Sequence, residues 1–97
     1  MATVVYSAHA LAQIESLLRS RGEEAQDAAL HTCAAIRSAV ESLATHPLLG
    51  FGTREGLREL VISCGRTGYV ALYRYLVRHD EVRMLALRTQ RDVGLVP

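Results

Sequence analysis

The C-terminal part of the chain constrains its fold most, because three strand-like runs follow one another there with very short connections. The runs are Leu57–Ser63 (LRELVIS), Tyr69–Val77 (YVALYRYLV) and Val82–Leu87 (VRMLAL). Only the segments CGRTG and RHDE separate them. Connections this short join antiparallel neighbours, since a parallel pair needs a long crossover. We therefore expect three consecutive antiparallel strands, a β-meander.

The N-terminal part begins with one short strand and then takes on the residue spacing of a helix. Thr3–Tyr6 (TVVY) predicts the strand, because its residues are β-branched or aromatic. Ser7 is suited to cap a helix that runs through Arg21, in which apolar residues recur three and four positions apart. Gly22 ends this helix in the usual C-terminal way.

A second helix is predicted directly after this glycine. It begins near Glu23, where Glu24 and Asp27 place negative charge at the end that the helix dipole favours. It runs to about Thr45, with Pro47 beyond its end. Two helices joined by a tight turn form an antiparallel helical hairpin.

The predicted element order is therefore β-α-α-β-β-β, in a single domain over residues 1–97. The segment Pro47–Gly56 (PLLGFGTREG) is the one long loop. These elements predict an α+β fold with the helical hairpin packed on one face of an antiparallel sheet, because both layers must bury an apolar surface. No predicted element remains to cover the opposite face.

The two longest predicted strands carry apolar residues on both faces. Strict alternation puts Val70, Leu72, Arg74 and Leu76 on one face, with Tyr69, Ala71, Tyr73, Tyr75 and Val77 on the other. In the last strand it groups Val82, Met84, Ala86 and Arg88 against Arg83, Leu85 and Leu87. A sheet that is half in water normally alternates more cleanly. Either a partner protein covers the second face, or the chain dimerises through its sheet.

Composition narrows the chemistry that the chain can perform. The net charge is only +1, so any affinity for nucleic acid would have to come from local clustering. All eleven basic residues are arginine, which excludes a catalytic lysine and supplies planar groups suited to carboxylates and phosphates. With no export signal and no long apolar run, we expect a soluble cytoplasmic protein in which Cys33 and Cys64 are reduced thiols.

Four arginines, Arg58, Arg74, Arg88 and Arg91, lie on or beside the predicted strands. In one interpretation each pairs with Glu59 or a loop carboxylate, and its aliphatic stem packs on the sheet. In the other they form a cluster that binds an acidic peptide or a phosphate backbone. Both interpretations stay open, because strand register does not follow from the sequence alone.

Other reactive side chains give weaker signals. The histidines have no carboxylate or cysteine at ligand spacing, so we expect no metal site, no nucleophilic triad and no cofactor; they are His9, His31, His46 and His79. The tyrosines Tyr69, Tyr73 and Tyr75 favour a place in the core. Alternatively, their rings could stack on bases or anchor a partner's helix.

Four stretches together carry a family resemblance: SAHALAQIESLL, AIRSAVESLATHPLLGFGTREGLREL, GYVALYRYLV and VRMLALRTQRD. Through them the chain resembles the RelE/ParE superfamily of bacterial type II toxin–antitoxin toxins over essentially its whole length. The combination of GLREL, LYRY and a terminal RTQRD after an apolar strand is fairly specific. Thr89 stands where histidine is common in the family.

The resemblance implies a toxin that a small antitoxin neutralises. The antitoxin's C-terminal segment, disordered when free, would fold on the toxin as helix and strand. A segment rich in acidic and aliphatic residues would fill both an apolar sheet face and a cationic edge. Within this picture we expect Arg74 to hold an antitoxin carboxylate, and Arg91 with the terminal segment to contact the target. Packing roles are expected for Leu57, Leu60, Tyr73 and Leu87.

The superfamily divides by target, and the resemblance is closer to the ParE-like branch. RelE-like members cleave mRNA on the ribosome with basic residues of the sheet and a C-terminal tyrosine, whereas ParE-like members inhibit DNA gyrase. Val70 stands where RelE-like toxins carry a catalytic arginine, and Glu59 and Val61 stand where lysines would be expected. No tyrosine follows Arg91. The resemblance therefore implies a gyrase inhibitor without catalytic residues of its own.

Two alternatives stay open. A divergent ribonuclease could use Arg74, Arg88 and a histidine in new roles, given how often function departs from fold. The chain could also be a binding module without toxicity.

Overall fold

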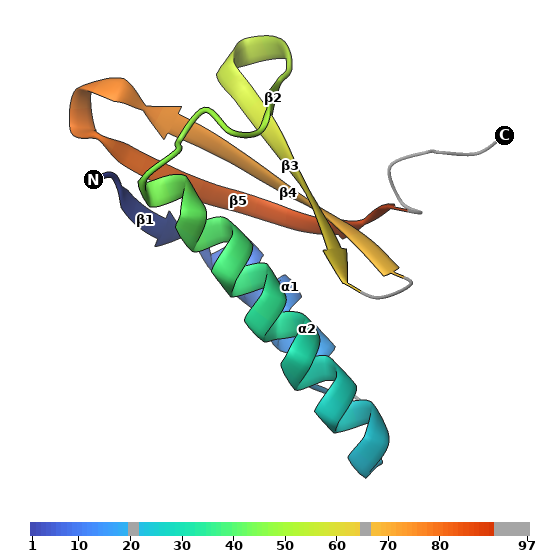
Figure 1. The fold of residues 1–97 in the computed structure, drawn as a ribbon. Coiled ribbons are helices and arrows are strands. Elements are labelled where there is room, and N and C mark those ends of the chain that lie inside the picture. The colour runs from blue at the N-terminus through green and yellow to red at the C-terminus, as the bar shows by residue number, and fades with distance from the viewer. Residues whose placement is uncertain (20–21, 65–66, 91–97) are drawn as a thin grey trace, which may run out of the picture.

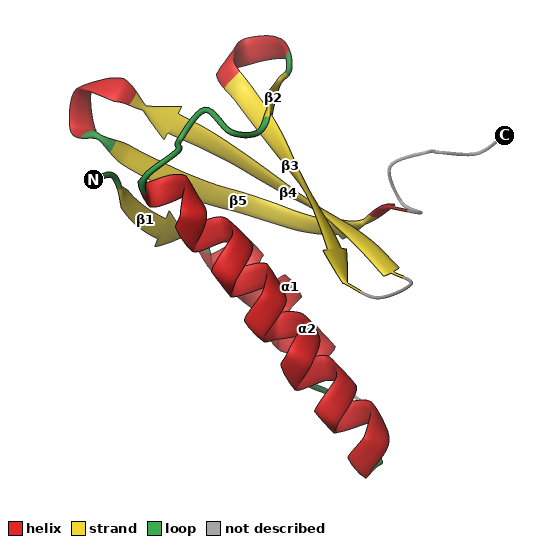
Figure 2. Cartoon of the chain, viewed as in Figure 1, coloured by secondary structure: helices red, strands yellow, loops and turns green. Residues whose placement is uncertain are grey.

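The computed structural model describes residues 1–19, 22–64 and 67–90. Its sheet has five strands in the order β1-β5-β4-β3-β2 (Figures 1 and 2). The strands are β1 (Thr3–Tyr6), β2 (Phe51–Gly52), β3 (Leu57–Cys64), β4 (Thr67–Leu76) and β5 (Glu81–Thr89).

The predicted meander is present. β3 pairs antiparallel with β4, and β4 pairs antiparallel with β5. The sheet as a whole is mixed, however, because β1 pairs with β5 in parallel. The chain between β1 and the meander contains the whole helical hairpin, which is long enough for the crossover that a parallel neighbour needs. The predicted loop also contributes the short strand β2, which pairs antiparallel with β3.

The two helices are close to their predicted positions. Helix α1 (Ala8–Leu17) starts at the predicted cap, where the Ser7 hydroxyl accepts a hydrogen bond from the Ala10 N–H at 3.0 Å. It ends four residues before the predicted Arg21, which lies outside the described residues. Helix α2 (Glu23–Glu41) continues into a short 3₁₀ helix at Ser42–Ala44, so the helical segment ends one residue before the predicted Thr45.

Both helices lie on the same side of the sheet, as predicted (Figure 1). The core between the helices and the sheet is apolar. Its largest fully buried side chains are Tyr73, Ile36, Leu43, Met84, Val40 and Val82. The N-terminal part of α2 extends beyond the sheet (Figure 1). In the described residues, no helix is long and apolar enough to cross a membrane.

Candidate functional site: the outer face of the sheet

Strand register decides which side chains face the helices and which form the outer face of the sheet. Tyr69, Ala71 and Tyr73 of β4 belong to the buried core. Their neighbours along the strand, among them Leu72 and Arg74, therefore point to the outer face. The predicted division of β4 is thus observed, and the interpretation of Tyr69 and Tyr73 as core residues is confirmed.

The predicted division of β5 is wrong after Met84. The register pairs Tyr73 with Met84 but Leu72 with Ala86, so Leu85 is one extra residue on β5. This β-bulge reverses the alternation beyond it. Leu87, rather than Ala86, then enters the core with 5% of its surface exposed. Arg88, which strict alternation would direct toward the helices, lies on the outer face.

Helix α1 and its cap hold this bulge in place through two side chains. The Ser7 hydroxyl donates a hydrogen bond to the Leu85 carbonyl at 3.0 Å. The Leu87 N–H donates to Oε1 of Gln13 at 2.6 Å. Both bonds satisfy backbone groups that the bulge displaces from the ladder. Ser7 therefore caps the helix and fixes the end of the strand beside it.

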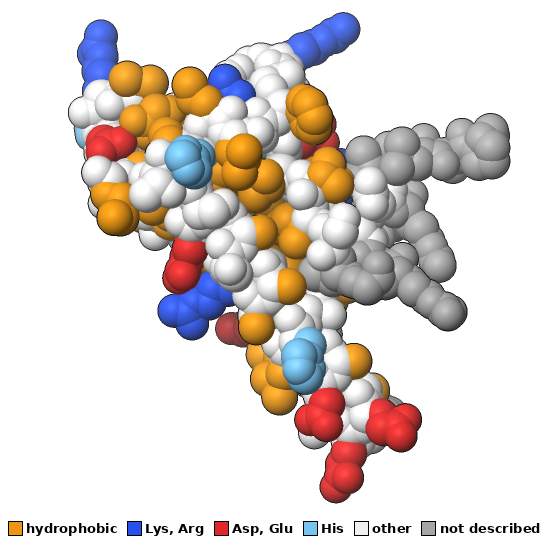
Figure 3. Space-filling view, in the orientation of Figure 1, with side chains coloured by type: hydrophobic (Ala, Val, Ile, Leu, Met, Phe, Trp, Pro, Cys, Tyr) orange, Lys and Arg blue, Asp and Glu red, His pale blue; other side chains and the backbone are white. Residues whose placement is uncertain are grey.

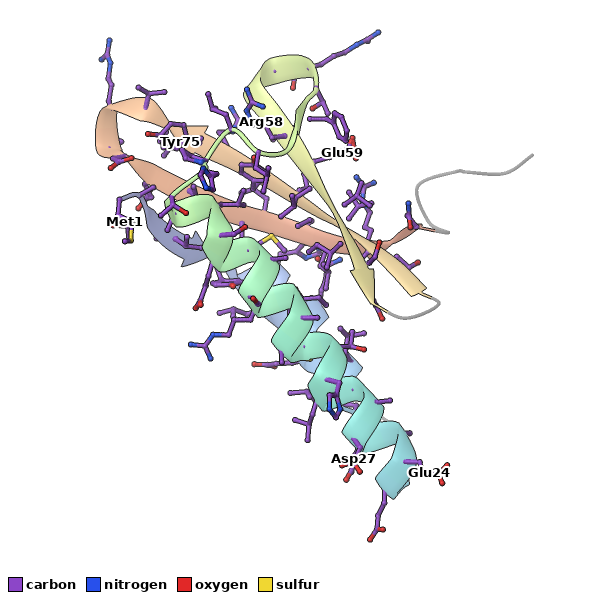
Figure 4. The ribbon with its side chains drawn as sticks, viewed as in Figure 1. Met1, Glu24, Asp27, Arg58, Glu59 and Tyr75 are labelled. Atoms are coloured by element: carbon purple, nitrogen blue, oxygen red, sulfur yellow. The ribbon has the colours of Figure 1, made fainter. Side chains whose placement is uncertain are left out.

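The structure separates Arg58 from the other predicted arginines. Arg58 is opposite Tyr73 in the register, so it is on the helix-facing side of the sheet. Its Nη1 donates to the carbonyls of Gly50 at 2.7 Å and Leu48 at 3.3 Å. Figure 4 shows Arg58 beside the loop between α2 and β3, while Glu59 points to the other side of β3. The geometry gives Arg58 a part in holding this loop.

Tyr73 completes the support of the same loop from inside the core. Its hydroxyl accepts a hydrogen bond from the Gly50 N–H at 2.9 Å and donates to the Pro47 carbonyl at 2.8 Å. A Cβ on Gly50 would lie 2.7 Å from the Glu59 carbonyl oxygen and 2.8 Å from the Tyr73 ring, so this position requires glycine. We call Arg58 and Tyr73, with the loop groups that they bind, the loop clamp.

Arg74 and Arg88 share the outer face but stand apart. Arg74 is opposite Leu57 and Arg83, whereas Arg88 is opposite Val70. Positions 70 and 74 of β4 are roughly 13 Å apart at the usual strand rise. The two arginines therefore lie toward opposite ends of the outer face. The fourth predicted arginine, Arg91, lies outside the described residues.

Within the described residues, neither Arg74 nor Arg88 forms an ion pair, with Glu59 or with any other carboxylate. Sequence reasoning also missed a third arginine of the outer face, Arg83, whose Nε donates to Oε2 of Glu81 at 2.8 Å. Its position could have been inferred, because the short turn before β5 sets Leu76 opposite Glu81 and hence Arg74 opposite Arg83.

Between the arginines the outer face is apolar. Val70 is the central residue and is itself only 4% exposed, with Val61 opposite it on β3 and Leu72 and Ala86 beside it. Large apolar side chains are exposed around this centre: Val5 by 39%, Val61 by 45% and Phe51 by 74%. On the opposite, helix-bearing side, Figure 3 shows acidic side chains gathered at the free end of α2, where Glu23 and Glu24 form the first turn. An apolar surface of this extent with scattered cations suits a protein partner.

The remaining reactive groups lie elsewhere. Tyr75 donates to the Asp80 carboxylate at 2.7 Å, and this hydrogen bond raises the pKa of the tyrosine. Burial raises the pKa of the free Cys33 thiol on α2. His9 and His31 lie on the helices, and His46 and His79 lie in connections. The residues that the structure describes contain no group of three or more histidine, cysteine or acidic side chains that could hold a metal ion.

Comparison with known proteins identifies the fold and the family. The family model of the ParE toxin of the type II toxin–antitoxin system parDE matches residues 4–94. No curated protein matches the sequence. Among solved structures, a chain of the chromosomal ParDE toxin–antitoxin system from P. aeruginosa aligns with a TM-score of 0.68 and 18% identity. A chain of the intact E. coli RelBE toxin–antitoxin complex aligns with a TM-score of 0.59 and 10% identity.

Each alignment covers 90% of this chain and 94% of the solved chain. At these identities the two structures show a shared fold, and the higher TM-score belongs to the ParDE chain. The family model covers nearly the whole sequence and carries the assignment. The chain belongs to the ParE family of type II toxin–antitoxin toxins.

Proposed function

We propose that this protein is a toxin that inhibits DNA gyrase, has no catalytic residues of its own, and is neutralised by an antitoxin bound to the outer face of its sheet. The observation that carries the choice of target is the apolar centre of this face. Val61 and Val70 are direct partners there, and Arg88 completes the row. This is the region where the family resemblance would place the basic residues of a ribosome-dependent ribonuclease.

Cleavage of a phosphodiester needs a general base, a general acid and cations around the scissile phosphate. Valine side chains supply none of these. In the described residues, the ionisable groups on the outer face are arginines and glutamates, and the four histidines are on helices or connections. A target that is bound rather than chemically altered agrees better with this set of side chains.

An antitoxin partner is supported by the same surface and by the solved relatives. The outer face combines exposed aliphatic residues with arginines, and no described element covers it. The E. coli relative was solved as a toxin–antitoxin complex. An antitoxin segment that alternates aliphatic and acidic residues would bury the aliphatic residues of this face and neutralise its arginines. Coverage of this face would also prevent the toxin from reaching its target.

A supercoiling assay with purified DNA gyrase tests the target. The toxin should abolish ATP-dependent supercoiling, and equimolar antitoxin, encoded beside the toxin gene, should restore it. Linear or nicked DNA should be scored in the same lanes, because a toxin that traps gyrase on cleaved DNA differs from one that blocks ATP-dependent turnover.

The matched control is translation on purified ribosomes with a defined mRNA. The proposal requires that the message stays intact at toxin concentrations that stop gyrase. Cleaved message with unaffected supercoiling would mean that other side chains perform the acid–base chemistry, and the ribonuclease alternative would replace the proposal. A toxin that leaves both supercoiling and the message unaffected would point to a binding module without toxicity.

A further inference from the structure

Two arginines stand directly opposite each other on the outer face. Arg74 of β4 and Arg83 of β5 are partners in the register, so their Cβ atoms are roughly 5 Å apart. Like charges at directly opposite positions destabilise an antiparallel pair. The free toxin therefore retains an arrangement that opposes its own stability. Such an arrangement is characteristic of a binding site rather than of packing.

The two guanidinium groups turn away from each other. Arg83 bonds to Glu81 on its own strand at 2.8 Å. Arg74 leans toward the start of β3, where its Nη1 would lie 3.7 Å from a Cβ added at Gly56. Within the part of the chain that the structure describes, no carboxylate pairs with Arg74. The two guanidinium groups are thus held apart in the free toxin, and Arg74, which no described carboxylate holds, can turn toward a carboxylate placed between the two strands.

Charge on this face favours one carboxylate over a polyanion. Glu81 already offsets the charge of Arg83, so Arg74, Arg83 and Glu81 together carry a net charge of about +1. The described outer face as a whole carries three arginines (Arg74, Arg83 and Arg88) and two glutamates (Glu59 and Glu81). A nucleic-acid backbone would require more cations in a row. A single acidic side chain matches the charge of the site and the fork geometry of arginine.

Aliphatic residues surround the pair. Leu57 is the other direct partner of Arg74, and Leu72 and Leu76 stand two positions before and after it on β4. Val5 is the partner of Arg83 on β1 and is 39% exposed. The occupant must therefore bring an acid within an otherwise aliphatic segment.

We infer that Arg74 and Arg83 form a two-sided carboxylate site on which an acidic residue of the antitoxin's aliphatic segment docks. This inference rests on the proposed antitoxin partner, and it adds Arg83 to the surface and a position for the acid. It also divides the outer face. The Arg74–Arg83 end binds the antitoxin, while the Arg88 end contacts the target.

The test measures two activities of the same full-length variants. Arg74→Gln, Arg83→Gln and the double variant are titrated with the antitoxin by calorimetry, and each is assayed for gyrase inhibition without antitoxin. Each single change should weaken antitoxin binding by about tenfold, and the double change by more, because each removes a charge-assisted hydrogen bond. Gyrase inhibition should stay within about twofold of the unaltered toxin. Arg37→Gln on α2, 76% exposed and paired with Glu41, is the control for the same loss of charge.

Two further measurements separate a binding site from a structural role. Thermal unfolding of free Arg74→Gln should occur at the same or a higher temperature than that of the unaltered toxin, since the repulsion is relieved. Arg74→Lys keeps the charge but loses the fork, so its affinity should fall between those of arginine and glutamine.

Unchanged antitoxin affinity in the double variant would overturn the inference. Lost gyrase inhibition with unchanged antitoxin affinity would assign the pair to the target and would overturn it as well. Failure of the unaltered toxin to inhibit gyrase would refute the proposed target alone, because the antitoxin titration does not depend on gyrase.

Discussion

The two faces of the sheet use the same residue types in opposite ways. On the helix-facing side, Arg58 donates to two loop carbonyls and the Tyr73 hydroxyl makes one bond as acceptor and one as donor. On the outer side, Arg74 opposes a second arginine and pairs with no described carboxylate. The two arginines are nevertheless close in the sheet, because Arg74 is opposite Leu57, the residue that precedes Arg58 on β3.

This contrast teaches how to distinguish a structural arginine from one that is available for binding. Satisfied donors stabilise the free protein and leave little to offer a partner. Unsatisfied donors on an exposed aliphatic surface stabilise the free protein little, and become useful only when an acceptor arrives. Substitutions on the helix-facing side should therefore lower stability, and substitutions on the outer side should lower binding or toxicity.

The largest effect is expected from removing the target-facing end of the outer face. A chain truncated after Leu87 should lose gyrase inhibition completely, because Arg88 and everything beyond it are missing. The Arg74–Arg83 pair remains, so binding of the antitoxin should stay measurable by calorimetry. Gyrase inhibition by the truncated chain would show that the terminal arginines do not act on the target.

Tyr73→Phe should give the largest loss of stability of any single change in the loop clamp. It leaves the Gly50 N–H and the Pro47 carbonyl without their partner, which should lower the free energy of unfolding by about 2–3 kcal/mol. Urea denaturation measures this change. Tyr75→Phe, which removes an exposed bond to Asp80, is the control and should lower it by less than about 1 kcal/mol.

Arg58→Gln and Arg88→Gln form a matched pair that tests the contrast directly. The first should lower the free energy of unfolding by about 1–2 kcal/mol and leave the gyrase inhibition of the folded fraction unchanged. The second should change stability by no more than about 0.5 kcal/mol and weaken inhibition of gyrase. If Arg58→Gln impaired inhibition while its stability was normal, the assignment of Arg58 to the loop clamp would be wrong.

Local sequence signals predicted most of the fold. Ser7 as a cap, the helical hairpin and the meander follow from residues close together in the chain, and the structure has all three. The parallel pairing of β1 with β5 was not predicted, because it joins residues nearly 80 positions apart (Thr3 with Glu81). No local pattern specifies such a contact.

The candidate site was less predictable than the fold. The sequence did contain a signal that Arg58 faces the helices, because residues two positions apart share a face of a strand and Leu60 and Ile62 are buried. The orientation of Arg88 had no such signal. It depends on a bulge whose supporting bonds come from Ser7, 78 positions before Leu85, and Gln13, 74 positions before Leu87. A one-residue change of register reverses every later side chain.

Gln13 gives the finest test of the contrast, because it lies on the helix-facing side but controls a residue of the outer face. Gln13→Leu removes the acceptor of the Leu87 N–H and should lower the free energy of unfolding by about 1 kcal/mol. Amide hydrogen exchange at Leu87 should accelerate, and gyrase inhibition should weaken, since Arg88 follows directly in the chain. The affinity for the antitoxin should change least, because Arg74 and Arg83 lie between the bulge and the β4–β5 turn, where the register is not shifted. Equal losses of both activities would mean that the bulge supports the whole outer face rather than only its target-facing end.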